Sequence, residues 1–375
     1  MKSKIIFQLG VLMLTTLLFT SCRKEHKHYC DGDDTITTTT KVFATGFNNP
    51  RGLKFGPDGY LYVAEGGIGG KNASTDCEQV PPPVGPYTGD VTGSRISRVD
   101  HQGNRTTWVD NLPSSMDVMG DIVGVGDVAF IDNTLYAVIT GAGCSHGVPT
   151  IPNSVIKINP NKSWTPVANL SEYLKSHPVA NPEEDDFEPD GDWYSMTNVG
   201  TDLYAIEANH GELDKISTNG TITRVIDISA TYGHIVPTVH AFRKGNFYVG
   251  NLNVFPAPPT GSSIYKITPE GQISEYATGF SMILGIAFDK LGGLYVLETT
   301  TNNPFPTPGT GDIVRIDPSG NRQVITTGLT FPTGMTLGND GKIYVSNRGF
   351  GFPPGEGQVL QISFKCEEMS ANIKN

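Results

Sequence analysis

The chain repeats one short sequence phrase six times, and in five of the copies the same position holds a side chain with an oxygen atom. In each copy this position lies three residues after a tyrosine, and its occupants are Glu65, Ile139, Glu207, Asn251, Glu298 and Asn347. Carboxylate and amide oxygens are the ligands that hard cations prefer. If the copies converge on one axis, all of these residues except Ile139 predict a site for Ca²⁺ or another divalent cation. The alternative is that each side chain caps its own strand end by bonding backbone groups or water.

A second set of residues lies in loops. If the six copies surround one axis, these loops would lie around the same end of that axis. These candidate ligand-binding residues are Arg51, His146, Trp193, His210, His234 and Arg348. A histidine beside a glutamate suits general acid–base chemistry, although loop residues of this kind are more often ordinary surface. The chain has no His-Glu-x-x-His helix and no phosphate-binding loop. The residues therefore specify no reaction, and no cofactor other than the cation is expected.

The repeated phrase itself indicates the fold. In its most complete copies, 49–65 and 331–347, a short strand, an Asp-Gly turn and a second alternating strand follow one another. Later copies are spaced about 45 to 50 residues apart, which is typical of propeller blades. A third strand of the type Ile-x-Arg/Lys-Ile/Val, as at 264–267 and 313–316, precedes a turn and a fourth strand. The sequence therefore predicts an all-β, six-bladed β-propeller over residues 35–366.

The two ends of the repeat region predict how the ring closes. The last repeat ends after its third strand, 358–364, whereas the segment 35–45 precedes the first phrase without a partner. The sequence of 42–47, Val-Phe-Ala-Thr-Gly-Phe, closely matches the fourth strand at 324–329, Val-Ile-Thr-Thr-Gly-Leu. We expect the N-terminal segment to complete the last blade, because this removes an open sheet edge.

The first residues of the chain resemble an export signal. An apolar run, 5–20, follows two lysines, is too short for a comfortable transmembrane helix and leads into Thr-Ser-Cys. This ending resembles a bacterial lipobox and predicts a signal peptide over 1–21 with lipidation at Cys22. We expect a membrane-anchored lipoprotein, periplasmic or on the cell surface, with a polar tether at 22–34 and a C-terminal tail at 367–375. The alternative is an ordinary cleaved signal that ends near a cysteine.

The other four cysteines are expected to pair, because disulfides persist in an oxidising compartment. Closure of the last blade by the N-terminal segment places Cys30 and Cys366 at the same end of one antiparallel pair, which predicts a disulfide. Cys77 and Cys144 follow the second strands of neighbouring blades and form the second predicted pair. The alternative for Cys77 and Cys144 is a role as small buried residues.

Two stretches interrupt the blade pattern. Residues 66–93 form a Gly/Pro-rich insertion in the first blade, and residues 175–192 form an acidic loop. The acidic run at 183–186 lacks the spacing of an EF-hand calcium loop and is typical of a solvated surface.

The charge of the chain limits its partners. The formal net charge is −11, and removal of 1–21 takes away Lys2 and Lys4 with no acidic residue, which leaves −13. Because this charge repels phosphate backbones, nucleic acid is not an expected partner. The expected partners are a membrane, through the lipid anchor, and a small-molecule or protein ligand at the channel face. A neutral or cationic ligand is easier to accommodate than an anion.

Several phrases together resemble the ScyD/ScyE family, propellers named after genes of scytonemin biosynthesis. They are 55–59, 61–65, 276–280 and 294–298, and the likeness covers nearly all of 41–364, with 236–256 the more specific stretch. NHL-repeat proteins and gluconolactonases share the simpler phrases. The predicted oxygen ring resembles the site at which gluconolactonases bind a metal with Glu, Asn and Asp. This chain departs from the ScyD/ScyE pattern at 190–194 and 207–211, which implies a different ligand if the third blade lines a site.

Two functions of different classes follow from these observations. The first is a non-catalytic propeller that acts as a ligand- or protein-binding scaffold, which the absence of an assigned catalytic residue favours. The second is a metal-dependent hydrolase or lactonase-like enzyme that uses the acidic ring. Metal analysis of the purified protein distinguishes them.

Overall fold

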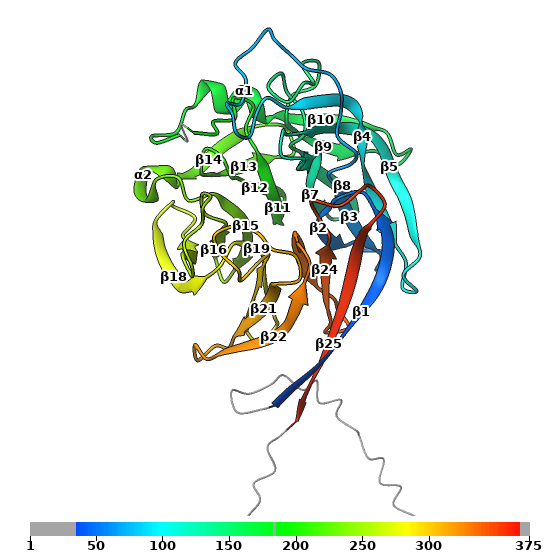
Figure 1. The fold of residues 1–375 in the computed structure, drawn as a ribbon, viewed down its shortest axis with the longest axis vertical. Helices are drawn as coiled ribbons and strands as arrows, with labels where there is room; N and C mark the ends of the chain where they lie inside the picture. The colour runs from blue at the N-terminus through cyan, green and yellow to red at the C-terminus, as the bar shows by residue number, and fades with distance from the viewer. Residues whose placement is uncertain (1–34, 183–184, 368–375) are drawn as a thin grey trace, which may run out of the picture.

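Antiparallel sheets arranged around a common centre make up the structure. The computed structural model describes residues 35–182 and 185–367, and its six sheets form the blades of a β-propeller (Figure 1). The all-β, six-bladed prediction is therefore confirmed.

Each blade takes its strands in chain order, except the last. The first blade holds β2 (Pro50–Phe55), β3 (Leu61–Glu65), β4 (Thr88–Val99), β5 (Arg105–Met116) and β6 (Ile122–Val123). The second holds β7 (Val125–Ile131), β8 (Thr134–Ile139), β9 (Ser154–Ile158) and β10 (Trp164–Asn169). The third holds β11 (Trp193–Val199), β12 (Asp202–Glu207), β13 (Glu212–Ser217) and β14 (Ile222–Asp227).

The remaining blades complete the ring. The fourth holds β15 (Pro237–Arg243), β16 (Asn246–Asn251), β17 (Ser262–Ile267) and β18 (Ile273–Phe280). The fifth holds β19 (Ile283–Phe288), β20 (Leu294–Glu298), β21 (Gly311–Ile316) and β22 (Arg322–Leu329). The sixth holds β23 (Gly334–Leu337), β24 (Ile343–Asn347), β25 (Gly357–Glu367) and β1 (Thr35–Phe47).

The ring closes as the sequence predicts. Strand β1 pairs antiparallel with β25, from Thr35 opposite Glu367 to Phe47 opposite Gly357, and Figure 1 shows the two ends of the described chain side by side. The predicted Cys30–Cys366 disulfide is not tested, because Cys30 lies outside the described residues. The lipidation site Cys22 lies outside them as well.

The repeated phrase has a physical explanation in its turn. In the first blade, the Asp58 carboxylate accepts hydrogen bonds from the Tyr60 backbone N–H and, at 2.9 Å, from the Tyr62 hydroxyl. Gly59 follows with φ of 79°, a left-handed conformation that favours glycine. In the sixth blade, the Tyr344 hydroxyl donates to Asp340 at 3.0 Å in the same way. Asp, Gly and Tyr therefore recur because together they define the hairpin between the first two strands.

Hydrophobic packing holds neighbouring blades together. One buried cluster lies at each blade–blade contact, for example Tyr62, Val128 and Ala137 between the first and second blades. The contact that closes the ring packs Phe47 and Leu53 against Tyr344. Burial of apolar surface at each contact is the main stabilising term for the ring.

The first strands of the blades surround the central channel. A cavity of about 30 Å³ is lined by residues of all six of these strands, among them Lys54, Asp127, Ser195 and His240. Gly52 is required there, because a Cβ at that position would lie 2.0 Å from Asp127 Oδ1. Pro50 pairs with Glu65, so the start of a first strand and the end of a second strand share one face. We call this the loop face.

The structure adds features that the sequence analysis does not predict. The first blade has a fifth strand, β6, which pairs with β5. Two short helices, α1 (Leu170–Ser176) and α2 (Ser229–Tyr232), follow the outer strands of the second and third blades. The start of the expected loop 175–192 is therefore the end of a helix. None of the helices in the described part of the chain is long and apolar enough to cross a membrane.

Candidate ligand site at the mouth of the channel

A second cavity, of about 40 Å³, lies where the first three blades meet on the loop face. Its polar lining residues come from separate segments: Arg51, Asp121, Thr140, Asp192 and Tyr194. Val123, Gly124 and Gly126 supply the apolar part of its wall. In small-molecule sites, a few convergent polar groups of this kind fix the orientation of the ligand.

Arg51 is fixed in the wall of this cavity. Its Nη2 donates to Asp121 Oδ1 and to the Ile122 carbonyl oxygen, both at 2.7 Å, and its exposed fraction is 6%. Burial disfavours the charged guanidinium, but Asp121, Tyr194 and Asp192 together outweigh this and raise the pKa of Arg51. Arg51 therefore presents a permanent, pre-positioned positive charge.

Asp192 provides the opposing charge. It accepts a hydrogen bond from the Thr140 hydroxyl, and burial together with the charge of Glu188 raises its pKa to about 6. Tyr194 lies beside it and donates its hydroxyl hydrogen to the Thr333 carbonyl oxygen at 3.2 Å. The cavity thus combines a cation, an acid that protonates near neutrality, and hydroxyl groups.

Glu188 connects three loops next to the cavity. It accepts a hydrogen bond from the Tyr87 hydroxyl at 3.1 Å, and its Oε2 lies 3.3 Å from His146 Nε2. Burial opposes protonation of His146, but the hydrogen bond and charge of Glu188 together with the charges of Asp190 and Asp192 raise the pKa of His146. The Glu188 carbonyl oxygen also lies 2.9 Å from His210 Nε2. Two of the predicted ligand-binding histidines therefore meet at one acidic residue.

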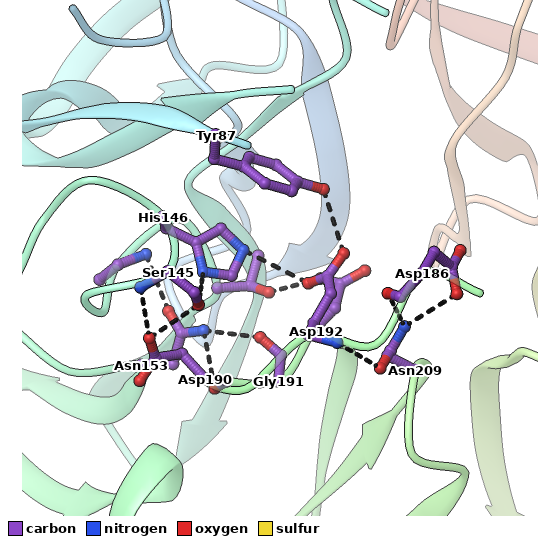
Figure 2. Close-up of polar contacts among 12 residues, drawn as sticks. Tyr87, Ser145, His146, Asn153, Asp186, Asp190, Gly191, Asp192 and Asn209 are labelled. Carbon is purple, nitrogen blue, oxygen red and sulfur yellow. Dashed lines mark hydrogen bonds and ion pairs between the residues drawn. The ribbon is translucent and has the colours of Figure 1, made fainter. Parts of the chain in front are cut away.

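Asp190 fixes the same segment from its other side. Its Oδ2 accepts hydrogen bonds from the Ser145 backbone N–H and hydroxyl, and its Oδ1 pairs with Lys175 Nζ at 2.6 Å. The Asn153 side chain donates to the carbonyl oxygens of Asp190 and Gly191 (Figure 2). Glu188, Asp190 and Asp192 thus each bind a different group of partners. Together these contacts fix the segment 188–192 at the mouth of the channel.

From the sequence we expect no Gly-x-Ser-x-Gly elbow, yet Ser145 lies in a stretch, 143–147, that matches this motif. A nucleophile elbow needs a strand–turn–helix context and an accessible serine. Here the stretch lies between two strands, Ser145 is fully buried, and its hydroxyl hydrogen goes to Asp190. Ser145 is therefore a structural residue of this loop.

A disulfide links two of these loops. Cys77, in the insertion of the first blade, is bonded to Cys144. The predicted Cys77–Cys144 pairing is confirmed. It joins the segment that carries Tyr87 to the segment that carries His146, so the surroundings of Glu188 are covalently connected.

The structure brings only part of the predicted ligand-binding set together. Arg51 lines the cavity, and His146 and His210 contact Glu188. Trp193 is wrongly placed by the sequence analysis: it begins β11 and is fully buried in the core between the second and third blades. Arg348 lies away from the cavity, with its guanidinium 5.1 Å from the Phe352 ring. His234 is half-buried and does not line the cavity.

The predicted oxygen ring is made of separate caps. Glu207 accepts backbone hydrogen bonds from Asp192 at 2.7 Å and from the residues at 209–211. Glu65 accepts from the Asn48 backbone N–H at 2.6 Å and from Arg95 Nε at 2.9 Å.

The other members of the ring bind in the same way. Asn251 accepts from the Ser263 N–H at 2.8 Å, Asn347 accepts from the Thr330 N–H at 2.9 Å, and Glu298 accepts from the Ser281 N–H. Each side chain therefore binds backbone groups of its own blade or of the loop that leads into it, as the capping alternative describes.

Within residues 35–182 and 185–367, no three His, Cys, Asp or Glu side chains are placed to hold one metal ion together. Cation binding by Glu65, Glu207, Asn251, Glu298 and Asn347 stays a prediction.

The sequence predicts only one polar residue of the cavity, Arg51. Asp121, Thr140, Asp192 and Tyr194 are not among its candidates. One sequence feature could have indicated Asp192 and Tyr194 as site residues. It is the phrase 190–194, where the chain departs from the ScyD/ScyE pattern and two aspartates precede a Trp-Tyr pair. That departure coincides with one wall of the cavity.

Comparisons with known proteins define the fold and no more. No protein-family model matches the chain, and no curated protein matches it by sequence. A structural genomics protein of unknown function from Bacteroides thetaiotaomicron is similar with a TM-score of 0.56 at 11% identity, over 88% of this chain and 77% of that one.

Two further solved structures resemble the chain at the same level. The PQQ-bound aldose sugar dehydrogenase of Streptomyces coelicolor gives a TM-score of 0.55 at 14% identity, over 90% of this chain and all of the other. A putative gluconolactonase gives 0.52 at 11% identity, over 88% of this chain and 93% of that one. These neighbours support the propeller fold. They do not support the ScyD/ScyE resemblance in particular.

Proposed function

We propose that this protein is an exported, lipid-anchored propeller, similar in pattern to the ScyD/ScyE family, that binds a small polar ligand without transforming it. The observation that carries the proposal is the meeting of Arg51, Thr140, Asp192 and Tyr194, from the first three blades, at one cavity on the loop face. The network around Glu188 supports the proposal, because it holds the wall of the cavity in place before any ligand arrives.

The chemistry of the cavity favours a neutral or cationic ligand. Asp121 already pairs with Arg51, so the guanidinium is not a free anion receptor. Asp192 and Glu188 add acidic groups at the same mouth, and the chain as a whole carries −11. Ligand hydroxyl or ammonium groups can donate to Asp192, and hydroxyl groups can accept from Arg51. A polyol or amino sugar has this set of groups.

The alternative of a metal-dependent hydrolase has less support. Among the described residues, no group of three acidic, histidine or cysteine side chains is arranged for a metal. The gluconolactonase and sugar dehydrogenase neighbours are too distant in sequence to transfer an activity. The alternative therefore stays a prediction, to be tested by turnover assays of lactones with and without added metal.

A matched series of sugars tests the proposal. Glucosamine, glucose and gluconate share a carbon skeleton but are cationic, neutral and anionic. We expect saturable binding by calorimetry in the order glucosamine, glucose, gluconate, and a loss of roughly tenfold or more in Asp192→Asn. Tightest binding of gluconate would refute the charge argument. Absence of binding by all three at millimolar concentration would refute the ligand class.

A control pair separates the cavity from the rest of the loop face. Arg51→Gln removes a cavity residue, whereas Arg348→Gln makes the same chemical change beside Phe352. Only Arg51→Gln should weaken binding. Equal effects of both variants would show that the ligand lies elsewhere on this face.

A further inference from the structure

Aromatic side chains gather on the loop face of the fourth, fifth and sixth blades. Phe255 and Phe305 follow the second strands of the fourth and fifth blades, and 41% and 58% of their surfaces are exposed. Their rings are stacked, with centroids 6.0 Å apart and an interplanar angle of 24°. Single exposed apolar side chains are ordinary, whereas a cluster of them marks a binding surface.

The sixth blade adds a second stack to the same face. The rings of Phe331 and Phe350 lie 4.4 Å apart at an angle of 24°, and the Phe352 ring lies 6.2 Å from Phe331. Phe331 precedes the first strand of this blade, and the other two follow its second strand. All three are half-buried. Three consecutive blades therefore present phenylalanine on one face.

Other blades show that the fold does not require an aromatic side chain at the position of Phe331. Asn49 and Met282 hold this position in the first and fifth blades, and all three residues have a left-handed φ, of 52°, 41° and 44°. Asn49 is 3% exposed and Met282 is fully buried. The backbone conformation is therefore common to these repeats, whereas a partly exposed ring is particular to the sixth blade.

Contacts between the loops join the aromatic surface to the cavity. The ring pair described above already connects the fourth-blade loop to the fifth. A Cβ at Gly311 would lie 2.9 Å from Pro332 Cδ, so the fifth-blade loop lies against the loop of the sixth. Thr333, the next residue, accepts a hydrogen bond from the hydroxyl of Tyr194 at 3.2 Å. Because Tyr194 lines the cavity, the aromatic surface is continuous with the cavity wall.

The size of the cavity requires contacts outside it. Its volume is about 40 Å³, whereas sites that enclose a small molecule have roughly 300 Å³ or more. The cavity can therefore receive the polar groups of only part of a ligand. The remainder must lie on the neighbouring surface, where the rings are.

The loops around the rings are nearly free of charge. The stretches 252–262, 299–311, 330–338 and 349–355 contain no Asp, Glu, Lys, Arg or His, and they include several asparagines and threonines. Surfaces that insert into membranes are usually rich in Lys or Arg, so this composition disfavours lipid as the partner. Amide and hydroxyl groups beside aromatic rings instead suit an uncharged ligand rich in hydroxyl groups.

We propose that the cavity and the aromatic surface together bind an oligosaccharide, with the terminal unit at the cavity and further units against the rings of the sixth and fifth blades. This inference rests on the proposed function and deepens it, because the ligand becomes a chain of sugars. A pyranose ring has an apolar face of C–H groups that can lie on an aromatic ring, and its hydroxyl groups can bond the amide and hydroxyl side chains.

The length of the sugar chain provides the test. Glucosamine and its β-1,4-linked tetramer are titrated into the full chain by calorimetry. We expect the tetramer to bind at least about tenfold more tightly than glucosamine. Phe305→Ala and Phe352→Ala should each reduce this advantage by roughly threefold or more. Phe242→Ala makes the same chemical change at the far end of a first strand, away from the loop face, and should leave the advantage unchanged.

The outcomes distinguish this inference from the proposed function. Equal affinities for glucosamine and the tetramer would overturn the inference and leave the proposed function standing, as would a tetramer advantage that both Phe305→Ala and Phe352→Ala retain. Tetramer binding that is insensitive to Asp192→Asn would overturn both, because the ligand would then not reach the cavity. A concentration-dependent dimer of the full chain that Phe305→Ala abolishes would also overturn the inference, since the rings would then contact a second copy.

Discussion

His146 and Glu188 belong to different loops, yet His146 Nε2 lies 3.3 Å from Glu188 Oε2 and both side chains are buried. The first loop follows the second strand of the second blade, and the other precedes the first strand of the third blade. This pair therefore joins two blades at the mouth of the channel. Its ionisation should influence both the stability of the ring and the shape of the cavity beside it.

We expect stability to fall as pH rises through the raised pKa of His146. Because the pKa in the folded state lies above the ordinary value of about 6.5, the ion pair contributes fully below that pH and is lost above the folded-state pKa. Urea unfolding between pH 5.5 and 8.5 should show a free energy of unfolding that decreases as pH rises, by the part attributable to this pair. His146→Gln should flatten this dependence, whereas His101→Gln, at an exposed turn, should retain it. An unchanged profile in His146→Gln would contradict the assignment.

Glu207→Ala should destabilise the protein by about 3 kcal/mol, because it leaves several buried backbone N–H groups without an acceptor. Glu207→Gln retains one acceptor oxygen and should cost less. Denaturant unfolding is to be measured in calcium and in chelator. Equal losses in both buffers are expected from capping, while a loss confined to calcium buffer would instead favour the predicted metal ring.

The disulfide between Cys77 and Cys144 should contribute substantially to stability. Its sequence separation is 67, and closure of a loop of that length corresponds to roughly 4 kcal/mol in the chain-entropy account. The double variant Cys77→Ser/Cys144→Ser should unfold at lower urea concentration than the parent. An equal midpoint for the oxidised parent and the double variant would show that packing alone holds these loops.

Peptide mapping without reductant should find Cys30 linked to Cys366. This prediction comes from the sequence, which places both cysteines at the same end of one antiparallel pair. In the structure β1 pairs with β25 as expected, with Ile36 opposite Cys366. Recovery of both cysteines as free thiols would leave the ring closed by strand pairing alone.

Cys22→Ser should release the protein from the membrane fraction into the soluble fraction. The physical reason is that acyl chains on Cys22 supply the apolar surface that partitions into the bilayer. Immunoblots of fractionated cells provide the measurement. Membrane retention equal to that of the parent would contradict lipidation at this residue.

The sequence by itself determined the blades, their order and the closure of the ring. Asp58, Gly59 and Tyr62 act within one hairpin, so their spacing reports local structure directly, and repetition multiplies that signal. The match between 42–47 and 324–329 similarly identifies a fourth strand. The Cys77–Cys144 pair followed from the blade order, because two loops on one face of adjacent blades are neighbours.

Only the tertiary structure decided the site. The five oxygen-bearing residues occupy equivalent positions, but each accepts a hydrogen bond from the backbone of its own blade or of the loop that leads into it. Trp193 and Tyr194 are neighbours in sequence, and strand alternation sends one into the core and the other to the cavity. Arg51, Thr140 and Asp192 are far apart along the chain and meet because three blades pack around one centre. The spacing of residues along the chain predicts contacts within one repeat. Contacts between repeats depend on how side chains fill the space where blades meet, which the spacing does not show.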